Sequence, residues 1–458
     1  MNDVFLIGIA MTKFGKYPGK TIKQLTAEVV HDVLQDANVS KQAIQAVWFA
    51  NSGWGRLSGQ DAIRGQTALR PLGIERIPIT NVENACAGGS TALNAAYMAI
   101  AGGVYEVALV VGVEKTFDRD KMKVFAGFLG GTDVEDFSQN LSLFDALEQM
   151  ISIRSNQWMD DASPKKNGLN WMARLSRLPD QVKQTIIYSD LYGRKNFHTL
   201  IERGMAKSRS PFMDVYSLAA RVHMDTFGTT QRQLAIIAAK NHWHGSLNPQ
   251  AQYTQSMTPE QVLADTHISY PLTRAMCAPV GDGAAAAIVC SKGFLRSCEH
   301  TGAVRIRASV LGSGRTRAFD EEDSTIALGR RAFELAGVGS EDINFAELHD
   351  ATAFGELHHS EMLGFCREGE GGRFAESGAT RLGGRLPINT SGGLESRGHP
   401  VAATGLAQVY ELALQLRGRA DRRQVPNARI GLAQNGGGII GIEEAAMCIH
   451  ILEAPHAN

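Results

Sequence analysis

The sequence has little of several features that mark specialised classes of protein. Its six cysteines form no CxxC pair, which argues against a structural zinc site and against a disulfide framework. Acidic and basic residues nearly cancel to a formal net charge of -1, so no positive excess is available for nucleic acid. No apolar run is long enough to cross a bilayer, and an acidic residue precedes the N-terminal apolar run, where a signal peptide carries positive charge. We therefore expect a cytoplasmic protein with neither a nucleic-acid nor a membrane partner.

What the sequence does contain is an alternation of strand-like and helix-like segments. Short β-branched or aromatic runs such as DVFLIGIA, AVWFAN and EVALVVGVE alternate with amphipathic stretches of helical length such as TIKQLTAEVVHDVLQDA. This alternation is typical of an α/β protein whose sheet is largely buried. At 458 residues the chain is too long for one ordinary core and long enough for several domains or one large duplicated unit.

Two correspondences between the halves of the sequence favour a duplicated fold. The segments around Val39–Ile44 and Val338–Ile343 share a helix end, a polar turn and a following strand, with the same spacing from valine to isoleucine. The segments ACAGG and GHPVAATG are each followed by a helix, a turn and a strand. We therefore predict two like α/β halves, each with a reactive-looking loop that leads into a helix.

One long segment interrupts this repeat. Residues 117–211 are rich in Met, Phe, Trp and charge, with irregular helical periodicity. Insertions of this kind commonly form lids or binding walls. We predict an N-terminal half formed by residues 1–116 and 212–300, an inserted loop domain over 117–211, and a C-terminal half over 301–458.

The first candidate for chemistry is Cys86 in the stretch NACAGGSTALNAA. We expect Ser90 to cap a helix that begins at Thr91, so that the helix dipole lowers the pKa of Cys86 and favours its thiolate. The neighbouring glycines would let backbone N–H groups approach and stabilise an oxyanion. The alternative is that Cys86 is a small buried hydrophobic residue at a turn, which is the more common fate of a free cysteine.

Two histidine loops in the second half are further candidates. His399, between a glycine and a proline, precedes a helix at the position that matches Cys86, where it could take the thiol proton; the alternative is a surface turn histidine. His349 and Asp350 end a predicted strand, where ligands bind in open α/β sheets. The stretch LAQNGGGIIG predicts a glycine-rich turn with free N–H groups for a phosphate or an oxyanion, but it is no dinucleotide motif.

The stretch HHSE could suggest a metal site. His358, His359 and Glu361 fall on a predicted helix, where a solvated polar face is the more common arrangement, and we expect no metal ion. Cys277 and Cys290 flank the apolar run AAAAIVC, so we assign them to the core.

Taken in order along nearly the whole chain, these motifs resemble the thiolase superfamily. The resemblance rests on Cys86 before a Gly-Ser helix start, the HDA turn, SGGLESRGHPVAATG, and NGGG followed by CIHIL, and it is closer to sterol-carrier-protein and archaeal thiolases than to degradative ones. It implies a duplicated five-layer αβαβα fold with an inserted loop domain. The implied reaction, within lipid metabolism, is thiolytic cleavage of a 3-oxoacyl-CoA or the reverse Claisen condensation. Coenzyme A would be a substrate, with no permanently bound cofactor.

The resemblance also implies roles for individual residues. Cys86 would be the acylated nucleophile, and His399 its base and one oxyanion donor. His349 stands where ordinary thiolases have an asparagine that holds an oxyanion-site water. The N–H groups of Cys86 and Gly436 would form the other oxyanion hole. Three further residues, Gln434, Thr352 and Ala351, are the expected substrate-binding residues.

The sequence departs from the family where a second catalytic cysteine is expected. Gln434 and Ala351 occupy the two positions at which thiolases carry it, and neither side chain can titrate. Either His349 supplies the acid/base function, or the chain performs related chemistry such as retro-aldol cleavage or acyl transfer to another acceptor. We rank thiolysis or condensation first because Cys86 and His399 are both present.

The resemblance further implies partners and a substrate type. The family forms homodimers or dimers of dimers, and some relatives work beside a small zinc-containing OB-fold subunit that binds acyl-CoA, so the chain could be a scaffold that is active only with such a subunit. Lys165, Lys166, Arg174 and Arg177 would suit the 3′-phosphate of CoA, although a solvated helix face explains them equally well. The aromatic and Met content of 117–211 favours a bulky acyl group.

Overall fold

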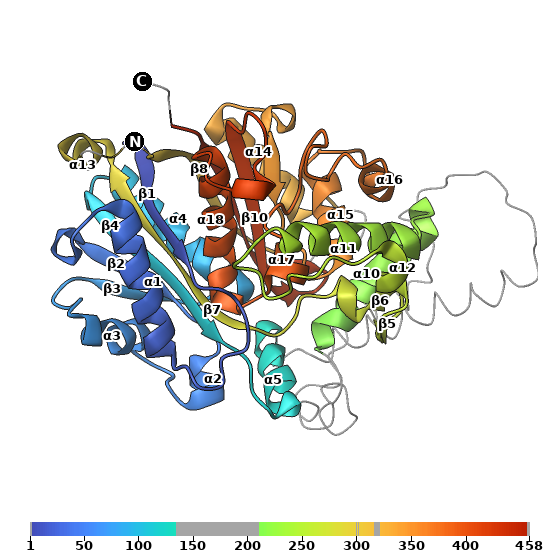
Figure 1. Cartoon of the computed structure of the whole chain (residues 1–458), viewed down its shortest axis with the longest axis horizontal. Coiled ribbons are helices and arrows are strands. Elements are labelled where there is room, and N and C mark those ends of the chain that lie inside the picture. The colour runs from blue at the N-terminus through green and yellow to red at the C-terminus, as the bar shows by residue number, and fades with distance from the viewer. Residues whose placement is uncertain (1, 134–209, 299, 301, 316–320, 456–458) are drawn as a thin grey trace, which may run out of the picture.

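A computed structural model describes residues 2–133, 210–298, 300, 302–315 and 321–455. Its centre is one nine-stranded sheet with the strand order β3-β2-β4-β7-β1-β8-β11-β10-β9 (Figure 1). The strands are β1 Val4–Met11, β2 Ala46–Ala50, β3 Ile79–Val82, β4 Val107–Lys115, β7 Asp282–Ser291, β8 Val304–Ser313, β9 Phe345–Glu347, β10 Ile430–Ile440 and β11 Glu443–Glu453. A second small sheet pairs β5 His267–Ser269 with β6 Leu272–Thr273.

The order of pairing within the sheet shows the duplication. In the first half β1 pairs antiparallel with β7, β7 antiparallel with β4, and β4 parallel with β2. The second half repeats this order, since β8 pairs antiparallel with β11, β11 antiparallel with β10, and β10 parallel with β9. The two halves join where β1 pairs antiparallel with β8. The predicted duplicated α/β fold is thereby confirmed.

The two halves of the sheet form two layers, and helices cover both faces of each half. Two outer helix layers, two strand layers and one central helix layer together make five layers. α4 Gly88–Ala101 and α18 Thr404–Leu416 pack against each other and against strands of both halves, so they form the central layer. α1 Ile22–Ala37 covers the outer face of the first half, and α14 Ser324–Ala336 covers that of the second (Figure 1). The strands β4 and β7 are buried over nearly their full length, as expected for strands covered on both faces.

Three helices begin at the same kind of cap. α1, α11 and α12 each follow a Thr-x-x-Gln capping box, in which the threonine hydroxyl and the glutamine side chain satisfy free backbone groups. No described helix is long and apolar enough to span a membrane. The other helices are α2 Trp54–Ser58, α3 Arg64–Leu69, α5 Lys121–Phe128, α10 Pro211–Phe227, α11 Gln231–Ser246, α12 Pro259–Leu263, α13 Lys292–Ser297, α15 Ala353–Met362, α16 Gly371–Glu376 and α17 Gly393–Arg397.

The predicted insertion lies mostly outside the described residues. Of the segment 117–211, residues 117–133, which include α5 and the 3₁₀ helix Leu129–Gly131, and residues 210–211 at the start of α10 fall within them. Lys165, Lys166, Arg174 and Arg177 lie outside the described residues as well. The predicted domain boundaries therefore stay a prediction.

Candidate active site

Cys86 lies in a tight turn between a strand and the central helix α4. The turn is a short 3₁₀ helix, Ala85–Ala87, and α4 follows at once from Gly88. The expectation that Ser90 caps a helix beginning at Thr91 is wrong, because Ser90 is already buried inside the first turn of α4. Ala85 has a φ of 48°, a left-handed conformation that costs a non-glycine residue about 1 kcal/mol or more. Strain of this kind next to a cysteine is typical of a functional turn.

The second loop brings His399 to this cysteine. The distance between Cys86 Sγ and His399 Nε2 is 3.2 Å. On the other side of the ring, His399 Nδ1 lies 2.6 Å from the hydroxyl of Thr404, the first residue of α18. That hydroxyl donates to the carbonyl of Pro400, so it must accept from Nδ1–H. Thr404 therefore fixes the proton of neutral His399 on Nδ1 and leaves Nε2 free to accept the thiol proton.

The third predicted residue, His349, completes the cluster. Its ring centroid lies 5.4 Å from that of His399, and the donor atoms of Cys86, His349 and His399 all lie within 4.8 Å of one another. The side-chain amide of Asn435 donates to His349 Nδ1 at 2.9 Å, which places the ring proton on Nε2. The structure thus brings the three predicted residues together, with a base directed at the thiol and a second imidazole that acts as a donor.

Glycines make this close approach possible. A Cβ atom at Gly89 of α4 or at Gly112 of β4 would overlap the carbonyl oxygen of Ala402, which follows the His399 loop. A Cβ atom at Gly437 of β10 would overlap the Cys86 turn at Asn84 and Ala87. The site therefore forms where two helix N-termini and one strand meet without side chains between them.

Burial keeps all three groups neutral. Burial raises the pKa of Cys86 to about 12, helped by the negative charges of Glu444, Glu114 and Glu83. Burial also lowers the pKa of His399 to about 3, and that of His349 to about 3. The expectation of a thiolate stabilised by the helix dipole is therefore wrong, because desolvation outweighs the dipole at this turn. Cys86 and His399 form a neutral thiol and imidazole pair at neutral pH.

This pKa predicts how Cys86 reacts with an alkylating reagent. The thiolate is the reacting species, and its fraction at pH 8 is about one in ten thousand for a pKa near 12. Iodoacetamide should therefore label Cys86 slowly, with a rate that rises about tenfold per pH unit up to pH 10. Mass spectrometry of the Cys86 peptide measures this, with a free cysteine derivative as the control that levels off above pH 9. A plateau for Cys86 below pH 9 would contradict the prediction.

The predicted substrate-binding residues are held by the protein itself. Gln434 accepts from the backbone N–H of His349 at 3.0 Å and donates to Glu444 at 3.1 Å. The carbonyl of Ala351 accepts from the backbone of Ala278 at 3.0 Å. Thr352 is fully buried, and its hydroxyl has no hydrogen-bond partner among the described residues. Substrate contact by Gln434, Ala351 and Thr352 stays a prediction.

Gly436 belongs to a strand and is covered by a carboxylate. The stretch NGGG was expected to be an open turn, but it lies within the buried strand β10, so that expectation is wrong. The predicted oxyanion role of the Gly436 N–H stays a prediction. A Cβ atom at Gly436 would overlap the carboxylate of Glu444 on the neighbouring strand β11. Glu444 lies outside the motifs named above, and Thr404 and Asn435 lie inside two of them without an assigned role. The roles of these residues depend on contacts across the fold.

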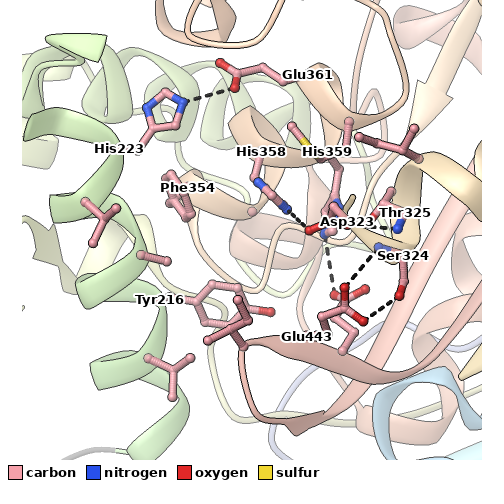
Figure 2. Close-up of a pocket in the computed structure, with 18 of the residues that line it drawn as sticks. Tyr216, His223, Asp323, Ser324, Thr325, Phe354, His358, His359, Glu361 and Glu443 are labelled. Carbon is pink, nitrogen blue, oxygen red and sulfur yellow. Dashed lines mark hydrogen bonds and ion pairs between the residues drawn. The ribbon is translucent and has the colours of Figure 1, made fainter. Parts of the chain in front are cut away.

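A cavity of about 310 Å³ lies next to Glu444, and Cys86, His349 and His399 are not among the residues that line it (Figure 2). α10 and Phe354 of α15 form an apolar wall, and Glu444 lines both this cavity and the surroundings of Gly436. His358, His359 and Glu361 also line it, so the expectation of a solvated polar face is wrong. They are paired, since His358 lies 3.4 Å from Asp323, His359 3.4 Å from Glu444 and Glu361 3.0 Å from His223.

Cys86, His349 and His399 together offer the donor atoms of a metal site. One sulfur and two imidazoles are a donor set that zinc accepts in proteins. The direct contact between Cys86 and His399 at 3.2 Å, with Thr404 behind the ring, also suits a nucleophile and its base. The predicted absence of a metal ion stays a prediction.

Sequence comparisons identify the relatives of this chain. Residues 4–153 match the family described as "Thiolase, N-terminal domain", and residues 320–452 match "Thiolase C-terminal domain-like". The chain is 33% identical to an acetyl-CoA acetyltransferase of Methanothermobacter thermautotrophicus, over 96% of this chain and 98% of that protein. It is 31% identical to sterol carrier protein 2 of Bos taurus, over 100% of this chain and 76% of that protein.

Structural comparisons agree on the fold. The structure matches an "Ltp2-ChsH2(DUF35) aldolase" with a TM-score of 0.70 and 20% identity, over 99% of this chain and 98% of that chain. It matches an acetyl-CoA acetyltransferase from Syntrophomonas wolfei with a TM-score of 0.62 and 15% identity, over 99% of both chains. At these identities the matches establish a shared fold.

Proposed function

The chain belongs to the thiolase family, and on that premise we propose that it cleaves a 3-oxoacyl-CoA with CoA, or runs the reverse Claisen condensation, through an acyl-enzyme on Cys86. The observation that carries this proposal is the 3.2 Å contact between Cys86 Sγ and His399 Nε2. Thr404 holds the ring in the tautomer that a base needs. Coenzyme A is the substrate in this proposal, and no resident cofactor is required.

The neutral pair sets the order of proton and electron movement. Because the thiol of Cys86 is not ionised, His399 takes its proton as the sulfur attacks the substrate carbonyl. We assign one oxyanion to the Nε2–H of His349 and of protonated His399, because the donor atoms of both rings lie within 4.8 Å of the Cys86 sulfur. The backbone N–H groups of Cys86 and Gly436 form the second oxyanion hole of the proposal.

The cavity lined by Glu444 supports a bulky acyl group. Its volume of about 310 Å³ and its apolar wall suit a large hydrocarbon tail. Seven carboxylates also line it, which would repel the phosphates of CoA, so the proposal has CoA approach from another side. The seven are Glu321, Glu322, Asp323, Glu361, Glu368, Glu443 and Glu444.

A second candidate is a lyase or acyltransferase on the same fold. It is favoured by Ala351 and Gln434, which replace the second catalytic cysteine, and by the structural match to an aldolase that contains a DUF35 partner. In this alternative Cys86 carries no acyl group through the cycle, and activity depends on a small zinc-containing OB-fold subunit. A homodimer or dimer of dimers, cytoplasmic location and the predicted domain boundaries remain parts of the proposal for either candidate.

A screen of CoA esters tests the proposal. The full chain is mixed with acyl-CoA and 3-oxoacyl-CoA esters of increasing tail size, with and without a candidate small subunit, and the Cys86 peptide is examined by mass spectrometry. We expect an adduct with the mass of the acyl group on Cys86, strongest with bulky tails. Turnover without any Cys86 adduct would favour the lyase. Neither an adduct nor turnover with any ester or subunit would contradict the thiolase proposal.

A further inference from the structure

We propose that Glu444 is the residue that moves the second proton of the reaction, to and from the α-carbon of the acyl-CoA. The inference rests on the proposed function and fills the role that Ala351 and Gln434 cannot perform. It begins from a carboxylate that the fold places against Gly436, the neighbour in the chain of the glycine that packs on the Cys86 turn.

The position of Glu444 depends on two neighbouring glycines. Its carboxylate fills the space beside Gly436 that any other residue would occupy with its own Cβ atom. The next residue of that strand, Gly437, packs directly against the backbone of the Cys86 turn. The negative charge of Glu444 consequently acts on both Cys86 and His349. Its carboxylate is thus within electrostatic reach of the groups that would surround a bound thioester.

Two side chains, Gln434 and His359, hold the carboxylate of Glu444, and the imidazole of His359 can exchange a proton with it. Gln434 donates to one carboxylate oxygen at 3.1 Å, and His359 lies 3.4 Å from the other. Its side chain is 13% exposed, at the wall of the cavity (His359 is labelled in Figure 2). Burial by itself would raise the pKa of Glu444, but the charge of His359 and its contact with the carboxylate lower it below its usual value. The carboxylate is therefore ionised and ready to accept a proton.

The other groups around Cys86 are less suited to this role. His349 accepts from the Asn435 amide on Nδ1, so its Nε2 carries a proton and neither ring nitrogen is free to take another from the substrate. Glu114 accepts from the backbone N–H groups of Ser52 and Gly53. Glu83 accepts from the backbone of Ala85. Ser52 also donates its hydroxyl to Glu83, and Asn51 its amide to Glu114. Of the three carboxylates whose charge raises the pKa of Cys86, Glu444 is the one that contacts a histidine, His359.

With Glu444 as proton carrier the condensation step balances. Its carboxylate takes a proton from the α-carbon of the acceptor acyl-CoA, and the electron pair of that C–H bond forms the enolate. The enolate carbon forms a C–C bond to the carbonyl carbon of the acyl group on Cys86, and the C–S bond to Cys86 breaks. The leaving sulfur takes the proton back from Glu444, directly or through His399. Thiol and carboxylate are both restored, and thiolysis is the same sequence reversed.

Loss of deuterium from acetyl-CoA separates this step from acylation. Acetyl-CoA deuterated at its methyl group is incubated with the wild type, E444Q and the control E453Q, and label loss and the Cys86 adduct are followed by mass spectrometry. Glu453 is at the far end of the same strand and pairs with Arg307, so the control makes the same change away from the site. We expect E444Q to acylate Cys86 within about threefold of the wild type and to lose label at least about a hundredfold more slowly.

Each other outcome decides the question. Label loss at the wild-type rate in E444Q overturns the inference, as does label loss that disappears in H349A and persists in E444Q. If E444Q does not acylate Cys86, the variant E444D decides between the outcomes. The inference is supported if E444D acylates Cys86 and loses label faster than E444Q does. The inference is overturned if E444D acylates Cys86 without label loss, or does not acylate Cys86. A wild type that forms no Cys86 adduct with any ester contradicts the proposed function instead. A wild type that forms the adduct but keeps the label overturns the inference alone.

Discussion

Replacing Cys86 by alanine is expected to lower turnover at least about a thousandfold and to remove the acyl adduct completely. The reason is geometric, because Cys86 Sγ is the thiol that contacts an imidazole with a free nitrogen, at 3.2 Å. The sulfur of Cys448 lies near the hydroxyl of Thr91 instead, and Cys277 and Cys290 are buried in the core. Steady-state turnover with the best ester from the screen, together with the mass of the intact protein, measures both effects.

The control for this variant is Cys298→Ala. Cys298 is a partly exposed thiol just after α13, so its removal should change neither the adduct nor turnover. Turnover of C86A should also be compared with that of the wild type in the presence of a metal chelator, since the donor atoms of the cluster suit zinc. Full activity of C86A would exclude the acyl-enzyme. Zinc bound by the chain without any added subunit, and lost in C86A, would show that Cys86 is a metal ligand.

Much of the fold could be predicted from the sequence, and so could the proximity of Cys86, His349 and His399. Both depend on the order in which strands, helices and loops follow one another along the chain. The matching spacing of Val39–Ile44 and Val338–Ile343 reflects two equivalent strands, β2 and β9, each parallel to a central strand of its half. A duplicated topology places the loops before α4 and α18 at equivalent positions, so Cys86 and His399 had to meet. Strand order and repeat spacing are local patterns, which a single sequence retains.

The features that were missed depend on distant contacts and on burial. The helix dipole alone predicts the wrong direction for the pKa of Cys86, because burial and the charge of Glu444 raise it. His399 and Gly437, which pack at this turn, lie more than 300 positions away in the sequence. The polar residues of HHSE suggested a solvated helix face. In the structure α10 lies over them, and its His223 contacts Glu361. Thr404 could have been noticed, since a hydroxyl one turn after His399 can reach its ring.

Replacing His399 by alanine is expected to lower the rate of Cys86 acylation by about a hundredfold to ten-thousandfold. With a pKa near 12, the thiol of Cys86 has almost no thiolate of its own at neutral pH, so loss of the base cannot be compensated. The acylation rate of H399A should therefore rise with pH, as hydroxide takes the place of the imidazole. Rapid mixing with an acyl-CoA measures the rate, and His31→Ala, at an exposed helix position, is the matched control.

Thr404 separates the chemical role of His399 from a merely structural one. Thr404→Val keeps the shape of the side chain but removes the acceptor for Nδ1–H, so the neutral ring is free to carry its proton on Nε2, where it cannot accept the thiol proton. We expect acylation to fall about tenfold in T404V with little change in KM, and to recover in Thr404→Ser, which restores the hydroxyl. Equal losses in T404V and T404S would indicate that packing of α18 matters and the tautomer does not. Recovery in T404S alone would assign the loss to the proton on His399.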